Sequence, residues 1–260
     1  MGALHDGHLA LIQRAVDLGR PVVLSIFVNP TQFGPGEDFD HYPRPFDRDV
    51  ALAGEAGAEA VFAPDVSVMY PDGIAAAFPE EMLPAVATEP GLEDRCRPGH
   101  FAGVATVVSR LFDLVQPGHA VFGEKDYQQL AVIRALVSSC ADRWPGLVIH
   151  GHPTLREPDG LALSSRNAYL TPEERPAALG VIRALRLAAG MGSEGRDVRR
   201  IEEAMRAELV RHHLGPEYAV VRDPVTLATL ETVTGPARAL VAARLGRVRL
   251  IDNVPVGNEL

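Results

Sequence analysis

Residues 22–28 read VVLSIFV and are followed directly by Asn29-Pro30-Thr31-Gln32. A short, continuous apolar run rich in β-branched residues is typical of a strand that is buried on both faces. The polar residues after it stand where the carboxyl end of a parallel strand presents side chains to a ligand. This stretch therefore predicts an α/β fold with a binding loop at the end of the strand.

The segments on either side of this strand alternate between helical and strand patterns. Apolar residues recur at helical spacing before it, and Gly19 follows them as a helix C-cap signal. Strands that alternate with helices indicate βαβ units and a parallel sheet. Further helices are predicted at 47–58, 101–115 and 127–140, and further strands at 60–63, 120–122 and 147–149.

The pattern changes after about residue 170. Two helical stretches are predicted, at about 172–191 and 198–213, and the first has an N-cap candidate in Thr171 and a proline at its first position. Three short strands follow, EYAVVRD, ARALVAARLG and VRLIDNVPV. We therefore predict a Rossmann-like domain over residues 1–166 and a small α+β domain over residues 167–260.

Composition excludes several classes of protein. The formal net charge is -9, and the arginines are scattered, so a nucleic-acid partner is not expected. Apolar runs stay well short of the roughly 20 residues that a membrane-spanning helix needs. The two cysteines, Cys96 and Cys140, lie far apart in no metal or redox spacing, which predicts a reduced, cytoplasmic compartment.

The segment His5-Asp6-Gly7-His8 lies where a loop turns into the first predicted helix. A helix N-terminus offers unpaired N–H groups and partial positive charge, and the imidazoles add further donors, so the segment could bind phosphate. Two other interpretations stay open: a pair of histidines that caps the helix, or a metal site that recruits a third ligand from elsewhere.

Three more polar segments could carry chemistry. Residues 29–34 form either a ligand loop with Gln32 facing a hydroxy acid or an ordinary turn. Residues 123–126 place Lys125 where it could meet a phosphate and Asp126 where it could meet a ribose or a metal-bound water, or else form a solvated charged turn. Residues 163–167 offer two hydroxyls and a guanidinium to a polyphosphate, although serine-rich loops are common. The sequence has no GxxxxGK[ST] or GxSxG motif.

Together, the segments MGALHDGH, SIFVNPTQFG, RPGHFAGVATVV, FGEKDYQQL and DGLALSSRNAYL resemble the signature segments of the pantothenate synthetase family, in order and over nearly the whole chain. The resemblance implies a Rossmann-like parallel sheet of the HIGH-motif nucleotidyltransferase type, with HDGH and LSSR as the HIGH-like and KMSKS-like elements. It also implies ATP-dependent condensation of (R)-pantoate with β-alanine through a pantoyl-adenylate, releasing AMP and pyrophosphate. Mg²⁺ on the ATP phosphates, no protein metal site and a homodimer are further expectations.

The same resemblance assigns roles to positions, with His8 as the general acid. The catalytic residues that it implies are His5, His8, Lys125, Ser164, Ser165 and Arg166. Contacts to pantoate and β-alanine are implied for Asn29, Gln32 and Gln129. ATP contacts are implied for Met1, Gly2, Ala3, Leu4, His5, Asp6, Gly7, His8, Gly123, Glu124, Lys125, Asp126, Leu155, Leu163, Ser164, Ser165 and Arg166.

The chain departs from the family pattern in three places. Leu163 stands where the family usually has Met and Leu155 where it usually has Val, and both are mild apolar exchanges. In the family a central strand precedes HDGH, so we expect Met1 to be an internal methionine and that strand to be missing. Two alternative functions therefore stay open. In these alternatives, the chain is either a truncated, non-catalytic paralogue that binds nucleotide, or another HIGH-type nucleotidyltransferase that acts on a phosphorylated substrate.

Overall fold

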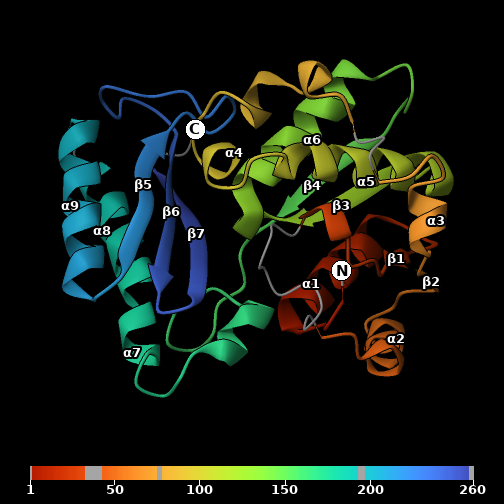
Figure 1. The fold of residues 1–260 in the computed structure, drawn as a ribbon, viewed down its shortest axis with the longest axis horizontal. Coiled ribbons are helices and arrows are strands. Elements are labelled where there is room, and N and C mark those ends of the chain that lie inside the picture. Colours follow the sequence, from red (N-terminus) through yellow and green to blue (C-terminus); the bar gives the residue numbers. More distant parts are fainter. Residues whose placement is uncertain (1, 33–42, 75–77, 193–196, 258–260) are drawn as a thin grey trace. The chain divides into compact units, whose positions relative to one another are not determined.

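A computed structural model describes residues 2–32, 43–74, 78–192 and 197–257. The chain forms two compact units: the first comprises Met1–Gly123 and Gln128–Pro153, and the second comprises Glu124–Tyr127 and Thr154–Leu260 (Figure 1). The predicted domain boundary at residue 166 stays a prediction. Among the described residues, every helix is too short or too polar to span a lipid bilayer.

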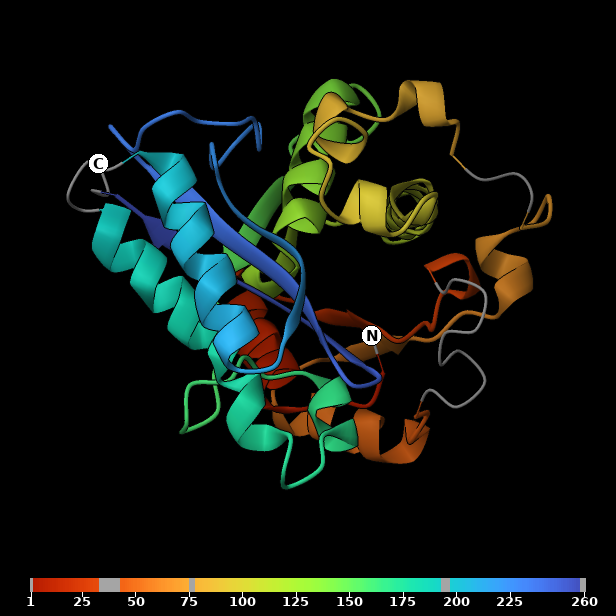
Figure 2. The same cartoon turned by 60° about the vertical axis from the view of Figure 1, so that its left-hand side comes forward.

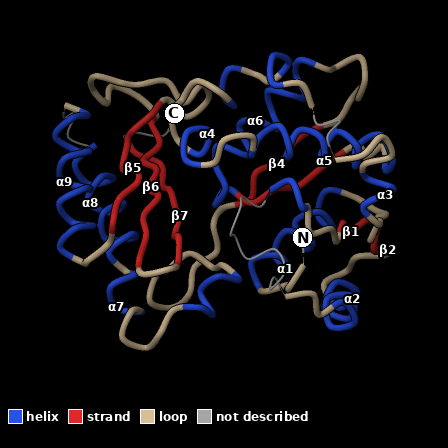
Figure 3. Tube along the Cα trace, viewed as in Figure 1, coloured by secondary structure: helices blue, strands red, loops and turns tan. Residues whose placement is uncertain are grey.

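The first unit holds two pairs of parallel strands, which confirms the predicted parallel α/β fold (Figure 3). Strand β1 (Val23–Ser25) pairs with β2 (Ala60–Phe62), and β3 (His119–Gly123) pairs with β4 (Val148–His152). The helices of this part of the chain are α1 (Asp6–Leu18), α2 (Phe46–Glu55), α3 (Val66–Met69), α4 (Glu93–Cys96), α5 (His100–Val115) and α6 (Tyr127–Ser139). The short 3-10 helices are η1 (Pro30–Gln32), η2 (Glu80–Met82), η3 (Ala85–Ala87) and η4 (Glu124–Asp126).

Strand β1 corrects one expectation, because it is covered on one face and not on both. Val22 and Leu24 are 6% and 3% exposed and pack in a core with Ile12 of α1 and Ala53 of α2. Val23, between them, is 40% exposed. Since side chains alternate along a strand, α1 and α2 shield the face that carries Leu24 and leave Val23 on the other face.

The second unit is built on an antiparallel sheet in the order β5-β6-β7, and its strands lie in the three segments that the sequence pattern indicated. Helices α8 and α9 lie on one face of this sheet, with α8 against β6 and β7 and α9 against β5 (Figure 2). Buried aliphatic side chains from these helices and strands form one continuous core. The elements are η5 (Ser165–Tyr169), α7 (Arg175–Ala178), α8 (Gly180–Gly192), α9 (Val198–Arg211), β5 (Gly215–Arg222), β6 (Ala237–Leu245) and β7 (Val248–Val256).

The helix predicted from residue 172 begins later, at Arg175. The hydroxyl of Thr171 accepts the N–H of Glu174 at 3.2 Å, and the carboxylate of Glu174 accepts the N–H of Thr171 at 3.0 Å. This reciprocal pair is the hydrogen-bonding pattern of a capping box. Here it closes a separate turn, so Pro172 lies before the helix and not at its first position.

Candidate active site

The HDGH segment forms the N-terminus of α1, with His5 as the N-cap residue. The backbone N–H of His5 donates to Nδ1 of His8 at 3.3 Å, and the two imidazole rings stack with centroids 3.9 Å apart. When His8 is neutral, accepting at Nδ1 leaves its ring proton on Nε2. The geometry therefore makes Nε2 of His8 a hydrogen-bond donor beside the positive end of a helix, which suits a phosphate.

Asp49 of α2 holds the loop before HDGH, a role that the sequence did not reveal. Its side chain is 1% exposed, and its two carboxylate oxygens accept the N–H groups of Ala3 and Leu4, each at 2.8 Å. Ala3 has the left-handed φ of 51°, which is unfavourable for a residue with a Cβ. The two charge-assisted bonds thus keep a strained backbone in place immediately before His5.

The exchange Asp49→Asn is expected to lower the free energy of unfolding by about 1.5–3 kcal/mol, because an amide nitrogen cannot accept one of the two N–H groups. Urea unfolding followed by circular dichroism would measure the loss. The matched control is Asp47→Asn, an exposed acid in the first turn of the same helix. That exchange should change stability by less than about 0.5 kcal/mol. Equal effects of the two exchanges would contradict the role of Asp49.

Asn29 is buried in a polar network at the end of β1. Its Nδ2 donates to the carbonyl of Gly103 at 3.3 Å, and its Oδ1 accepts the Tyr70 hydroxyl at 2.5 Å and the Thr31 N–H at 3.2 Å. Burial raises the pKa of the Tyr70 phenol, which keeps it a donor at neutral pH. A Cβ on Gly103 would lie 2.5 Å from Oγ1 of Thr31, so only glycine fits there. Asn29 shapes this loop, and its contact with substrate stays a prediction.

The two neighbouring glutamines at the start of α6 differ in burial and in their contacts. Gln128 is 3% exposed, and both ends of its amide bind the backbone. Its Oε1 accepts the Glu93 N–H at 2.9 Å, and its Nε2 donates to the Val86 carbonyl at 3.0 Å. Gln129 is only partly buried, as is Gln32 at the other predicted substrate position. Their proposed contacts with pantoate and β-alanine stay predictions.

In the second unit, the predicted phosphate residues Lys125, Ser164 and Arg166 line one pocket, although they lie far apart in the sequence. Asn167, Arg249 and Asp252 line it as well. The sequence analysis did not predict Arg249 or Asp252 as site residues. Charged residues inside the otherwise apolar strand VRLIDNVPV were the feature that could have indicated them. Ser165 begins η5 and lies outside this lining.

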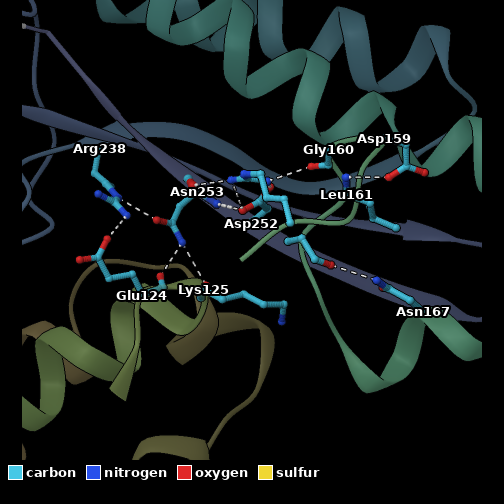
Figure 4. A network of polar contacts seen from close by, with 11 residues as sticks. Glu124, Lys125, Asp159, Gly160, Leu161, Asn167, Arg238, Asp252 and Asn253 are labelled. Carbon is cyan, nitrogen blue, oxygen red and sulfur yellow. Dashed lines mark hydrogen bonds and ion pairs between the residues drawn. The ribbon is translucent and has the colours of Figure 1, made fainter. Parts of the chain in front are cut away.

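The loop that carries LSSR is held by its own polar contacts (Figure 4). Nδ2 of Asn167 donates to Oε1 of Glu157 at 2.7 Å and to the Ala162 carbonyl at 3.0 Å. The guanidinium of Arg175 donates to Glu157 at 2.7 Å, and this bond lowers the pKa of the Glu157 carboxyl. Glu157 therefore stays ionised at neutral pH and keeps its bonds to Asn167 and Arg175.

The remaining residues predicted to contact ATP are divided between the two units. Gly2 to His8 and Gly123 belong to the first unit, and Glu124 to Asp126, Leu155 and Leu163 belong to the second. The predicted ATP-contact positions Leu155 and Leu163 are adjacent, because the N–H of Leu163 donates to the carbonyl of Leu155 at 2.9 Å. Met1 lies outside the described residues.

Comparisons with known proteins identify the family of this chain. The family profile described as pantoate-beta-alanine ligase matches residues 1–255. The chain is 53% identical to a pantothenate synthetase of Rubrobacter xylanophilus, over 97% of this chain and 88% of the relative. It is 50% identical to a pantothenate synthetase of Thermus thermophilus, over 98% of this chain and 91% of the relative.

Solved structures show the same likeness. A crystal structure of pantothenate synthetase from Thermus thermophilus superposes with a TM-score of 0.89 at 46% identity, covering 98% of this chain and 90% of that one. A pantoate-beta-alanine ligase from Francisella tularensis, complexed with beta-gamma ATP and β-alanine, gives a TM-score of 0.77 at 33% identity and covers 98% and 86%. The chain belongs to the pantoate–β-alanine ligase family.

Proposed function

We propose that this chain joins (R)-pantoate to β-alanine at the expense of ATP, forming pantothenate, AMP and pyrophosphate. The observation that carries the proposal is the family match over residues 1–255, with relatives about 50% identical over nearly the whole chain. The Francisella tularensis ligase, solved with beta-gamma ATP and β-alanine, supports these two substrates for this chain as well.

The reaction has two balanced steps. In the first, a carboxylate oxygen of pantoate attacks the α-phosphorus of ATP, and pyrophosphate leaves with the electrons of the broken P–O bond. In the second, the amine of β-alanine attacks the carbonyl carbon of the pantoyl-adenylate, AMP leaves, and the amine nitrogen loses a proton. Because the protein forms no covalent bond in either step, alignment and charge stabilisation supply the catalysis.

We assign roles that follow the chemistry of each side chain. His8 donates from Nε2 to a phosphoryl oxygen, with His5 beside it, while Lys125 and Arg166 neutralise the departing pyrophosphate. The hydroxyls of Ser164 and Ser165 add neutral donors to the same oxygens. Gln32, Gln129 and the loop around Asn29 bind pantoate and β-alanine, because amides can both donate to and accept from hydroxyl and carboxylate groups.

Mg²⁺ is proposed to enter with ATP. The side chains that line the pocket at Lys125 include two arginines, an amide and a hydroxyl, and the carboxylate of Asp252 in the same lining is bonded to Arg156, so the set suits phosphate oxygens more than a cation. Magnesium ions in such sites keep several waters and bind mainly through substrate phosphates. The ion would supply charge neutralisation on those phosphates.

An AMP-release assay with ATP, Mg²⁺, pantoate and β-alanine, each omitted in turn, tests the proposed function. AMP formation that requires both organic substrates is the expected result. AMP or pyrophosphate release with a phosphorylated substrate instead would favour another HIGH-type nucleotidyltransferase, which the comparisons do not support. A folded chain that binds ATP without turnover would favour a non-catalytic nucleotide-binding protein.

Two further properties belong to the proposal. A homodimer is inferred from the family resemblance, and analytical ultracentrifugation would show a particle of twice the 27.9 kDa chain mass. A cytoplasmic location is inferred because the sequence has only two cysteines, Cys96 and Cys140, which lie far apart in no metal or redox spacing. Subcellular fractionation followed by an immunoblot would test it.

A further inference from the structure

Lys125 lies on a segment that belongs to the second unit although its chain neighbours belong to the first. Strand β3 ends at Gly123 and the first unit resumes at Gln128, yet residues Glu124–Tyr127 contact the second unit. Lys125 is also the only lysine in the 260-residue sequence, which otherwise uses arginine for its cations. The contacts that hold this segment therefore decide where the single ammonium group lies.

Asn253 of β7 makes the central contacts to the segment (Figure 4). Its Nδ2 donates to the carbonyl oxygens of Glu124 and Lys125, at 2.8 Å and 3.0 Å. Its Oδ1 accepts from Nε of Arg238 at 2.7 Å. The side chain is 3% exposed, so both amide donors are committed to the backbone of the segment in a site that excludes water.

Arg238 of β6 completes the attachment. Its guanidinium donates to Oε2 of Glu124 at 2.9 Å and lies over the ring of Tyr127 with its central carbon 4.2 Å from the ring centroid. The side chain is 11% exposed. Through Arg238 and Asn253, the segment is held at both of its ends and in its middle.

Asp252, the residue before Asn253, binds the loop that precedes the LSSR motif. Asp252 accepts from Arg156 at 2.6 Å and 3.0 Å, and Arg156 also donates to the Gly160 carbonyl at 3.2 Å. These contacts support the loop that leads to Ser164. Adjacent residues of one strand thus secure the backbone of Lys125 and the loop of the LSSR motif.

We propose that Asn253 is a positioning residue that fixes the backbone of Lys125, and thereby its ammonium group, for the phosphates of ATP. The proposal rests on the proposed function in one respect, which is the role of Lys125 at those phosphates. A lysine is a point charge on a flexible stem, so its stabilising effect depends on where its backbone is anchored. Displacement of a catalytic group by about 1 Å can cost on the order of 10²-fold in rate.

The test variant is Asn253→Asp, which keeps the shape and the acceptor for Arg238 but turns two donors into acceptors facing two carbonyl oxygens. Asn253→Ala is the second variant, because it removes the donors without adding charge. We expect either to lower kcat/KM for ATP by about 10- to 100-fold in the wild-type background. The effect should shrink to less than about threefold in a Lys125→Ala background, since Asn253 acts through Lys125.

The matched control is Glu202→Ala. Glu202 is a partly buried acid of the same unit that accepts from the Val221 N–H at 3.0 Å and from Arg222 at 2.8 Å. Its loss should destabilise the unit and change kcat/KM equally in both backgrounds. A general destabilisation by the Asn253 variants would show this same additive behaviour, and that result would overturn the proposal.

Amide hydrogen exchange of residues 124–127, measured without ligand, tests the anchoring by Asn253 independently of the reaction that the chain catalyses. Exchange there should accelerate more than in the rest of the unit in both Asn253 variants, whereas the Glu202→Ala variant should show no such local excess. Unchanged exchange in the Asn253 variants would refute the anchoring whatever the reaction is. Accelerated exchange in a chain that releases no pantoate-dependent AMP would keep the anchoring and reject the proposed function.

Discussion

Replacing His8 with alanine should lower kcat for AMP release by roughly 10²–10³-fold, which corresponds to about 3–4 kcal/mol of transition-state stabilisation. The physical reason is the geometry at the start of α1: Nδ1 accepts the His5 N–H at 3.3 Å, so Nε2 carries the proton that a phosphoryl oxygen needs. Steady-state assays of AMP formation under saturating pantoate and β-alanine would measure the loss.

Two variants control this result. The amide of His8→Gln can place a donor near the position of Nε2, so that variant should retain more activity than His8→Ala. His119→Ala removes an exposed histidine of β3 and should leave the rate unchanged. A loss of tenfold or less in His8→Ala would remove His8 from the catalytic set.

Replacing Lys125 with alanine should cost a similar roughly 10²–10³-fold in kcat, because the departing pyrophosphate loses a nearby positive charge. Lys125→Arg should recover only part of the activity, since a planar guanidinium does not reproduce the compact ammonium charge. The exposed Arg247 of the same unit provides a control, and Arg247→Ala should have little effect.

The sequence also allows a direct binding test of Lys125. Because the chain has only one lysine, an amine-acylating reagent can modify only the chain terminus and the ε-amine of Lys125. We expect ATP to protect Lys125 from acylation, as measured by peptide mass spectrometry. Full labelling at saturating ATP, together with a loss of tenfold or less in Lys125→Ala, would contradict its phosphate role.

Local sequence patterns were sufficient for most of the secondary structure. The β-branched run at residues 22–28 located β1, and the helical spacing before it located α1 with its C-cap at Gly19. The same patterns overstated burial at Val23, because composition does not report whether one or both faces of a strand are covered. They also started the helix after Thr171 too early, since the capping pattern there closes a turn of its own.

The sequence by itself determined the family, the parallel α/β fold and the segments that carry HDGH, Lys125 and LSSR, because these are contiguous motifs whose order along the chain is visible. Only the tertiary structure showed that Asp49 holds the loop before His5 and that Asn253 holds the backbone of Lys125. Both roles consist of hydrogen bonds to main-chain atoms that are remote in sequence. Such bonds depend on how the elements pack, and the identity of a lone Asp or Asn does not reveal them.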